Sequence, residues 1–404
     1  MRIGIRVDAN EIVASGHIMR CRTIAESLRE LGQEPIFISA DDGIAIYIEG
    51  EGYEHIVLGT DWQDLDSEVD KIKKVLLQKE ITSIILDTYY VTLNYMESLK
   101  KAGIKILYID DLDKFKYPVD ALVNYSPSCL ECNYEEEYKN SETKLYTGIE
   151  YVPLRKQFCQ ENKNQSKIET ITTANMSNRD VKTNETVDIG KIFEAGNANI
   201  KDCYIEKSND IDELSSVKNK AITDIFMTSG GSDPLGISEH VISAILENSE
   251  FKDVTLHLLA GRYFKMTDKL TQLSQAKNAY DKPRFILHQN VSNVAEIMSS
   301  CQLGVTPAGT TLYELSACGV PSVSYIFADN QIADAVFFDK KGMIGYAGDY
   351  RIDADKCVAS IIDKLMQYKN MGLAGRAKVS ALLQSQVDGR GAERIAIAAQ
   401  NMCR

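Results

Sequence analysis

The chain up to about residue 150 alternates short apolar runs with stretches in which apolar residues recur every three or four positions. Short runs rich in Ile, Val and Leu are typical of buried strands, and the longer spacing is typical of amphipathic helices. Regular alternation of the two predicts a parallel sheet covered by helices. The predicted strands are residues 2–7, 34–39, 55–59, 83–87, 104–110, 121–125 and 144–148. One predicted helix begins at 16–18, and the others span 43–50, 63–79 and 91–102.

Between about residues 160 and 220 this pattern gives way to Asn, Lys, Thr, Ser, Asp and Glu. That composition is typical of a linker or a partly disordered polar insertion. An alternating second half follows, with predicted strands at 224–227, 254–260, 284–288, 303–306 and 322–326 and helices at 236–247, 264–276, 293–300, from 310, 331–342, 353–369, 372–386 and 391–402. We therefore expect an N-terminal domain over 1–158, an insertion over 159–221 and a C-terminal domain over 222–404.

Each half reads as a doubly wound, parallel α/β unit of the Rossmann-like kind. Ligands of such sheets bind at the carboxyl ends of the strands. In the first half, polar residues stand at several predicted strand ends, namely Asp8, Asp87, Tyr89, Asp110 and Asp111. Each of them alone can be a turn former or a helix cap, and we favour that interpretation for Asp111. Several on one edge together indicate a functional site.

The candidate site centres on the junction of the first strand with the first helix. The apolar spacing from Ile18 predicts a helix, so Ser15 or Gly16 can be its N-cap and His17 lies in its first turn. Unpaired N–H groups and the positive end of the helix dipole lie there, which disfavours imidazolium. A neutral imidazole accepts protons, so His17 is a candidate general base. The alternative is that His17 only caps the helix or packs under the loop.

Two glycine-containing loops of the second half join a strand to a helix. They are residues 230–233, Gly-Gly-Ser-Asp, and residues 307–311, Pro-Ala-Gly-Thr-Thr. The backbone N–H groups of such loops attract phosphate groups. The first loop has the glycine spacing of neither a Walker loop nor a dinucleotide fingerprint. Glu314 lies one helical turn beyond the second loop, where it can accept from ribose hydroxyls or, as the ordinary alternative, be a solvated helix residue.

Charge and cysteine content narrow the classes of partner and site. The 404 residues include 45 Lys and Arg against 58 Asp and Glu, a net charge of −13, which argues against nucleic acid or an anionic membrane as partner. There is no signal segment and no apolar run of the roughly 18 residues that span a bilayer, so we expect a cytoplasmic protein. The nine cysteines fit reduced thiols. Cys129 and Cys132 form a C-x-x-C without a second pair of metal-ligand spacing, so we predict no metal site.

A series of short motifs runs along nearly the whole chain outside residues 160–220. They are Arg6-Val7-Asp8, Gly16-His17-Ile18-x-Arg20, Asp87-Thr88-Tyr89, Asp110-Asp111, Leu154-Arg155, Gly230-Gly231-Ser232-Asp233, Thr310-Thr311-x-x-Glu314, Gly319-x-Pro321, Asp329-Asn330-Gln331 and Asp388-Gly389-x-Gly391-Ala392-x-Arg394. In this order they resemble the UDP-2,4-diacetamido-2,4,6-trideoxy-β-L-altropyranose hydrolases of pseudaminic acid biosynthesis. Ala14 departs from that pattern, since relatives usually carry glycine there, and the 160–220 segment has no counterpart in the shorter relatives.

The resemblance implies a glycosyltransferase-B-like pair of Rossmann-like domains facing across a cleft. It also implies hydrolysis of the glycosidic C–O bond of that UDP-sugar, which releases UDP and 2,4-diacetamido-2,4,6-trideoxy-L-altrose. The base falls on His17. Beside it, our own hypothesis names Asp8, Asp87 and Tyr89 as catalytic candidates that orient His17 or hydrogen-bond the acetamido groups of the sugar. No cofactor is implied, and the D-x-D of residues 111–113 is interpreted as a turn. Substrate or UDP binding is assigned to Arg6, Gly16, Arg20, Arg155, Gly230, Gly231, Ser232, Asp233, Gly309, Thr310, Thr311, Glu314, Asn330 and Gln331.

Two alternatives stay open at this point. A glycosyltransferase of the same fold would use an acceptor hydroxyl in place of water, and the fold alone does not separate the two. A nucleotide-sugar-binding protein without turnover would keep the glycine loops but would not need a base at His17. In each case the partner is a small-molecule UDP-sugar. The sequence leaves the oligomeric state open, a monomer included.

Overall fold

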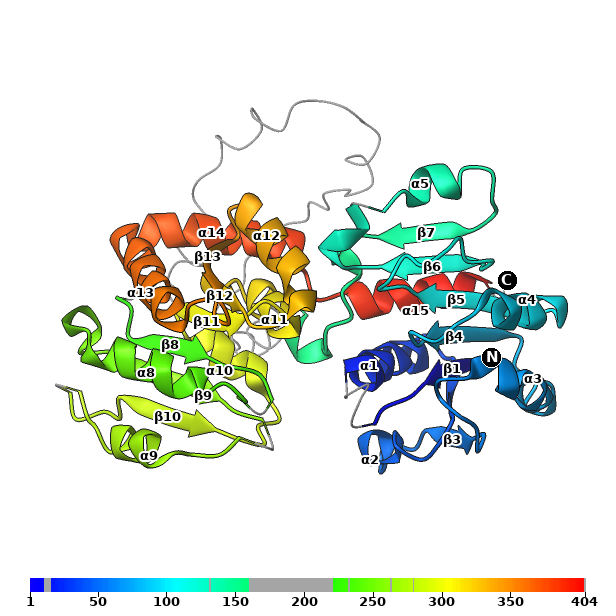
Figure 1. Ribbon diagram of the computed structural model, residues 1–404, viewed down its shortest axis with the longest axis horizontal. Helices are drawn as coiled ribbons and strands as arrows, with labels where there is room; N and C mark the ends of the chain where they lie inside the picture. The colour runs from blue at the N-terminus through cyan, green and yellow to red at the C-terminus, as the bar shows by residue number, and fades with distance from the viewer. Residues whose placement is uncertain are drawn as a thin grey trace, which may run out of the picture. The chain divides into compact units, whose positions relative to one another are not determined.

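The computed structural model describes residues 1–10, 16–130, 132–159, 221–231, 233–261, 264–278 and 280–402. Two parallel sheets form its framework (Figure 1). The first has 7 strands in the order β3-β2-β1-β4-β5-β6-β7, and the second has 6 in the order β10-β9-β8-β11-β12-β13. Both orders reverse direction beside their first strand, as in doubly wound folds. The insertion expected at 159–221 lies almost entirely outside the described residues.

The first sheet has buried apolar side chains on both faces, which is why its strands read as continuous apolar runs in the sequence. Its strands are β1 (Arg2–Val7), β2 (Glu34–Ser39), β3 (Glu54–Val57), β4 (Ser83–Asp87), β5 (Lys105–Ile109), β6 (Ala121–Asn124) and β7 (Lys144–Thr147). Its helices are α1 (Gly16–Glu30), α2 (Ala45–Ile48), α3 (Val69–Gln78), α4 (Leu93–Lys101) and α5 (Tyr134–Glu137), with short 3-10 helices η1 (Leu65–Glu68), η2 (Pro127–Leu130), η3 (Ile149–Tyr151) and η4 (Lys156–Phe158).

The second sheet is likewise covered on both faces. Its strands are β8 (Asp224–Met227), β9 (Thr255–Leu259), β10 (Phe285–His288), β11 (Leu303–Pro307), β12 (Ser322–Ile326) and β13 (Ile344–Asp349). The helices that follow are α8 (Ile237–Glu247), α9 (Asp268–Ser274), α10 (Val294–Ser300), α11 (Thr310–Ala317), α12 (Ile332–Lys340), α13 (Ala354–Asn370), α14 (Gly372–Gln386) and α15 (Gly391–Met402), with η6 (Ser249–Phe251) and η7 (Asp329–Gln331).

Three features differ from the sequence-based expectation, and the first is the single-turn helix α5, in a stretch for which no helix is predicted. Strand β13 is not predicted, because Gly345 and Gly348 interrupt its apolar pattern and glycine is depleted in strands. Helix α15 falls in the range expected for the second half, but Ile395 and Ala396 lie in the core of the first sheet, beside Ile18 of α1. Figure 1 shows α15, in red, beside α1. The chain therefore returns to its first sheet at its last described helix.

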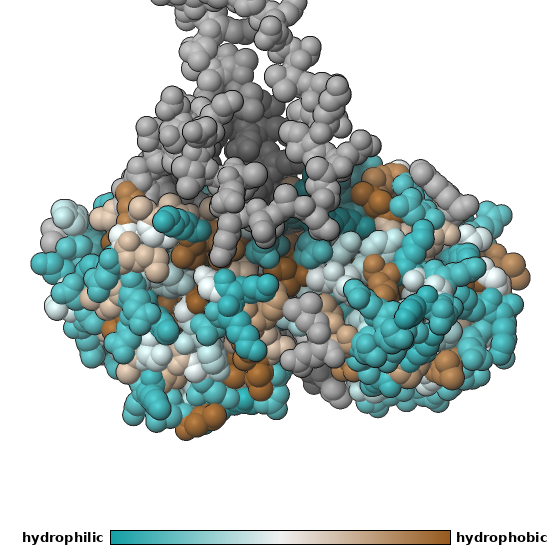
Figure 2. All heavy atoms as spheres, turned by 90° about the horizontal axis from the view of Figure 1, so that it is seen from above, coloured by the Kyte–Doolittle hydropathy of each residue, from teal (hydrophilic) through white to brown (hydrophobic). Residues whose placement is uncertain are grey.

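Figure 2 shows a face on which hydrophilic side chains predominate and hydrophobic ones are scattered. Scattered apolar residues are normal on a protein surface. Among the helices in the described part of the chain, none has both the length and the apolar content to cross a membrane.

Candidate active site

His17 lies in the first turn of α1 and is 5% exposed. Its Nδ1 lies 2.5 Å from Oδ1 of Asp87, the last residue of β4. A carboxylate can only accept a hydrogen bond, so we assign the proton of the neutral ring to Nδ1. The lone pair then lies on Nε2. This arrangement gives His17 one nitrogen that is held in place and one that can accept a proton.

Arg20 also binds the Asp87 carboxylate. Its Nε and Nη2 bond the two oxygens of Asp87 at 2.7 and 2.5 Å. Its Nη1 and Nη2 bond Asp111 at 3.1 and 2.7 Å, and Nη1 also donates to the Tyr125 hydroxyl at 2.7 Å. A guanidinium has five N–H groups, and these contacts use all of them. The arrangement does not support the expected substrate contact of Arg20, which instead binds the acid that orients His17.

The charge of Asp87 is fixed by these neighbours. Burial alone would raise the pKa of this carboxyl, but the Arg20 guanidinium, His17 and their hydrogen bonds outweigh burial and hold the pKa well below its usual range. Cys21 donates to Oδ2 of Asp87 at 3.2 Å, and burial raises the pKa of this thiol. Asp87 therefore stays ionised at neutral pH, with a neutral thiol beside it.

Tyr89 lies against the ring of His17. The two ring centroids are 4.5 Å apart and the planes are nearly perpendicular, at 83°. Burial, followed by the charge of Asp111, raises the pKa of Tyr89 to about 12, and the phenol also hydrogen-bonds Asp111. Tyr89 is thus a neutral phenol at neutral pH that packs on the candidate base.

The two aspartates that follow β5 have different tasks from those expected. Asp110 is fully buried and forms the turn, because its Oδ1 accepts from the backbone N–H groups of Leu112 and Asp113 at 2.9 and 3.1 Å. The interpretation of Asp111 as a turn former is wrong, since its carboxylate binds Arg20. A run of two acidic residues at a strand end was visible in the sequence, but not which of the two faces the site.

Arg6 and Asp8 belong to a separate buried network. Arg6 is fully buried and bonds both oxygens of Glu68 at 2.8 and 2.9 Å and Asp8 at 2.5 Å. The other oxygen of Asp8 accepts from the backbone N–H of Ala40 at 2.8 Å. Glu68 also accepts from the Tyr95 hydroxyl at 2.9 Å. These contacts join the ends of β1 and β2 and leave Arg6 no exposed donor for a substrate.

Of the two expected phosphate loops, the first is closed by its own side chain. Asp233 accepts from the backbone N–H groups of Ile237 and Ser238 at 2.8 and 2.9 Å, at the start of α8. The carboxylate thus stands where an anion would bind that helix. Gly231 packs closely on Gly261, where an added Cβ would lie 2.2 Å from the Gly231 carbonyl oxygen. Gly230 has a φ of +90°, and Ser232 lies outside the described residues.

The second loop leaves its helix open. Gly309 is the N-cap of α11 and has no side chain to accept from the first N–H groups of the helix. A Cβ at Gly309 would meet no heavy atom of the described residues within 4 Å, and Thr310 is exposed. In the described part of the chain, the start of α11 therefore offers uncapped N–H groups beside open space, which suits an anion.

Arg155 and Glu314 come together, although 159 positions separate them in the sequence. Arg155 Nη2 lies 3.0 Å from Oε1 of Glu314, one turn into α11. Burial raises the pKa of Glu314, and the charge of Arg155 opposes this rise. In η7, Gln331 accepts from the backbone N–H of Phe327 at 2.8 Å, and Asn330 is exposed. A ligand that uses the Glu314 carboxylate has to share it with Arg155.

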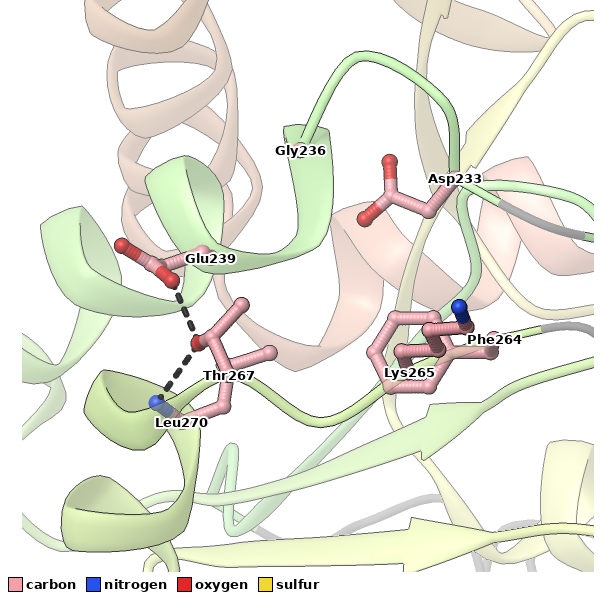
Figure 3. Close-up of a pocket in the computed structure, with 7 residues that line it drawn as sticks. All are labelled: Asp233, Gly236, Glu239, Phe264, Lys265, Thr267 and Leu270. Atoms are coloured by element: carbon pink, nitrogen blue, oxygen red, sulfur yellow. Dashed lines mark hydrogen bonds between the residues drawn. The ribbon is translucent and has the colours of Figure 1, made fainter.

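A small hollow of ≈ 230 Å³ lies beside the first loop and is lined by Asp233, Gly236, Glu239, Phe264, Lys265, Thr267 and Leu270 (Figure 3). Figure 3 shows Thr267 between Glu239 and the backbone of Leu270. Thr267 Oγ1 donates to Glu239 at 2.5 Å and accepts from the N–H of Leu270 at 3.1 Å. The polar groups on this side are thus engaged in holding α8 and α9 together.

The cysteine pair does not have thiolate character. Burial raises the pKa of Cys129 and raises that of Cys132 to about 12. Among the residues that the structure describes, no group of three or more His, Cys, Asp or Glu has the arrangement of a metal site.

Sequence reasoning missed Glu68 of the Arg6 network, and it missed Asp111 and Tyr125 as partners of Arg20. Glu68 lies in a 3-10 turn, and no local pattern marks it as buried. Tyr125 directly follows β6, so its position at a strand end was the available signal.

No protein-family model matches the chain. An uncharacterized protein of Methanocaldococcus jannaschii, MJ1062, is 22% identical over 327 residues, which cover 80% of this chain and 55% of that protein. A Helicobacter pylori protein named pseudaminic acid cytidylyltransferase and UDP-2,4-diacetamido-2,4,6-trideoxy-β-L-altropyranose hydrolase is 21% identical over 363 residues, 89% of this chain and 50% of that protein. The chain spans about half the length of these curated relatives.

Solved structures resemble the chain over nearly its whole length. MurG of Acinetobacter baumannii matches with a TM-score of 0.61 at 10% identity, over 99% of both chains. Anabaena HepE, solved in complex with UDP-glucose, matches with a TM-score of 0.51 at 13% identity, over 99% of both chains. At such identities the likeness concerns the fold. The chain therefore has the glycosyltransferase-B fold, with two parallel Rossmann-like sheets.

Proposed function

We propose that the chain hydrolyses the glycosidic C–O bond of a UDP-sugar, with His17 as the general base. One observation carries the proposal, namely the 2.5 Å pairing of His17 Nδ1 with the buried Asp87. A carboxylate in this position fixes the tautomer and stabilises the imidazolium that forms when Nε2 takes up a proton. A histidine that only capped a helix would not need such a partner.

In the proposed reaction, a water molecule attacks C1 of the sugar while His17 Nε2 takes its proton. The bond from the water oxygen to C1 forms as the bond from C1 to the β-phosphate oxygen breaks, so the configuration at C1 inverts. UDP leaves with the electron pair of that bond, and His17 later returns its proton to solvent. The uncapped N–H groups at the start of α11 stabilise the leaving diphosphate, and Glu314 accepts from the ribose.

For the substrate we propose UDP-2,4-diacetamido-2,4,6-trideoxy-β-L-altropyranose. The name of the Helicobacter pylori relative includes the hydrolase of this compound, and the sequence motifs resemble that family. Anabaena HepE, which shares the fold, was solved with a UDP-sugar, which supports the wider substrate class.

A glycosyltransferase is the second candidate, because a glycosyltransferase of Rickettsia africae shares this fold. The two reactions differ in the nucleophile. We would incubate the purified protein with the UDP-sugar in ¹⁸O-labelled water containing EDTA and weigh both products. We expect the label in the free sugar and none in UDP. Release of UDP only after an acceptor is added would favour the transferase, and label in a sugar phosphate would contradict C–O cleavage.

His17→Asn tests the base directly. General-base help is typically worth about 10² to 10⁴ in rate, so we expect kcat to fall by at least about 10² while UDP still binds. His240→Asn is the matched control, since His240 lies on α8 and contacts Tyr350 at 3.1 Å. Near-normal turnover by His17→Asn would exclude the base role, whatever the substrate.

A further inference from the structure

We propose that Asp111 is a positioning residue for His17 that acts through Arg20 and Tyr89. The inference rests on the proposed function, because it concerns the base of that reaction. Its starting point is that Asp111 contacts both groups that flank His17. Arg20 holds the Asp87 carboxylate that binds the ring, and the Tyr89 ring packs against it.

The contact with Arg20 is bidentate. Oδ1 and Oδ2 of Asp111 accept from Nη1 and Nη2 of Arg20 at 3.1 and 2.7 Å. A planar guanidinium bound on one edge by Asp111 and on the other by Asp87 cannot rotate without losing charge-assisted bonds. Loss of the Asp111 carboxylate frees one edge. Arg20 can then turn, so it no longer fixes the Asp87 carboxylate, and Oδ1 of Asp87 is no longer held toward His17.

The contact with Tyr89 gives the His17 ring a second packed neighbour. The Tyr89 hydroxyl bonds Asp111, and its ring meets His17 nearly at a right angle, with centroids 4.5 Å apart. A ring held by a bond at Nδ1 and by a packed neighbour keeps Nε2 in one direction. Preorganisation of this kind matters because a misplacement of about 1 Å can cost about 10²-fold in rate.

Asp111 also sets the charge around the base. With Arg20 positive and Asp87 and Asp111 negative, the three groups carry a net negative charge, which favours the imidazolium formed during turnover. Replacing Asp111 by Asn brings the net charge of these three side chains to zero, so the imidazolium of His17 is less favoured. Among the described residues, the titratable or charged groups that contact the His17 ring are Asp87, Tyr89 and Arg20. Cys21 binds Asp87, and Asp111 and Tyr125 bind Arg20.

The test compares Asp111→Asn with Asp113→Asn. Asp113 is another carboxylate of the same turn, is exposed, and hydrogen-bonds Cys132. For Asp111→Asn we expect kcat to fall by about 10- to 10²-fold with KM nearly unchanged. The acid limb of the pH–rate profile should move to lower pH. Asp113→Asn should match the wild type in kcat, in KM and in the pH–rate profile.

A second readout does not need turnover. The ¹⁵N resonances of the His17 ring report which nitrogen carries the proton, and we expect one tautomer in the wild type and a mixture in Asp111→Asn. An unchanged tautomer and pH profile in Asp111→Asn, with only a lower thermal midpoint, would reduce Asp111 to a structural residue and overturn the inference. If the wild type hydrolysed no UDP-sugar, the proposed function would fail, while the ¹⁵N comparison would still decide the role of Asp111.

Discussion

At the scale of single residues, the buried Arg6 and Glu68 give the clearest prediction for stability. Both side chains are fully buried, so Arg6→Met leaves the carboxylates of Glu68 and Asp8 without their cation. Breaking a buried pair in this way typically costs about 3–5 kcal/mol. We expect urea unfolding to show a loss of that size, with the UDP affinity of the folded protein unchanged.

The control is Arg2→Met on the same strand. Arg2 pairs with Glu34, and their side chains are 38% and 58% exposed. Exposed pairs contribute about 0–1 kcal/mol, so this variant should be nearly as stable as the wild type. If Arg6→Met kept its stability and lost affinity for UDP, Arg6 would be a ligand-binding residue as the sequence suggested.

Residue types at strand ends were predictable, but their partners were not. His17 and Asp87 stand out because helix starts and the carboxyl ends of parallel strands meet at one edge of a sheet. Arg6 lies in the same apolar strand and gave no sign that its partner, Glu68, lies 62 residues away. The same limit applies to Asp233, whose carboxylate closes its own helix. Local patterns place side chains on elements, whereas long-range contacts decide which remain available to a ligand.

At the scale of elements, the docking of α15 rests on a close backbone approach. A Cβ at Gly391 would lie 2.1 Å from the carbonyl oxygen of Val152. Overpacking of this kind typically costs about 1–3 kcal/mol, so Gly391→Ala should lower the urea midpoint and increase hydrogen exchange in α15. Gly16→Ala is the control, because a Cβ there would meet no heavy atom of the described residues within 4 Å. Equal stability of the two variants would contradict the tight contact.

Most elements follow from periodicity, and the exceptions have physical causes. Twelve of the strands were expected close to their observed positions, because parallel strands are apolar on both faces. Strand β13 carries two glycines and was missed. Helix α15 was recognised as a helix, but its amphipathic pattern carries no information about which of the two sheets it covers. The docking of α15 depends on how its surface fits the surface of the first sheet, which the sequence of the helix alone does not reveal.

At the scale of the whole molecule, Asp334 on α12 links stability to pH. Burial raises its pKa from the ordinary 3.8 to about 7, the charge of Asp111 adds to the rise, and the hydrogen bond from the Tyr313 hydroxyl, at 2.8 Å, opposes it. Between these two values the folded state binds more protons than the unfolded state. The titration of Asp334 therefore makes the protein less stable as the pH rises from about 4 to about 7.

Asp334→Asn should remove this dependence, because an amide stays neutral at every pH. We expect the free energy of unfolding of the variant, relative to the wild type, to increase between about pH 5 and pH 8, on the order of 1 kcal/mol or more. Urea titrations at several pH values measure it, with the exposed Asp363→Asn on α13 as the control. A difference that did not change with pH would mean that Asp334 is ionised throughout this range.

Because the charge of Asp111 acts on Asp334, Asp111→Asn should weaken the same pH dependence, which would show electrostatic coupling between the candidate active site and α12.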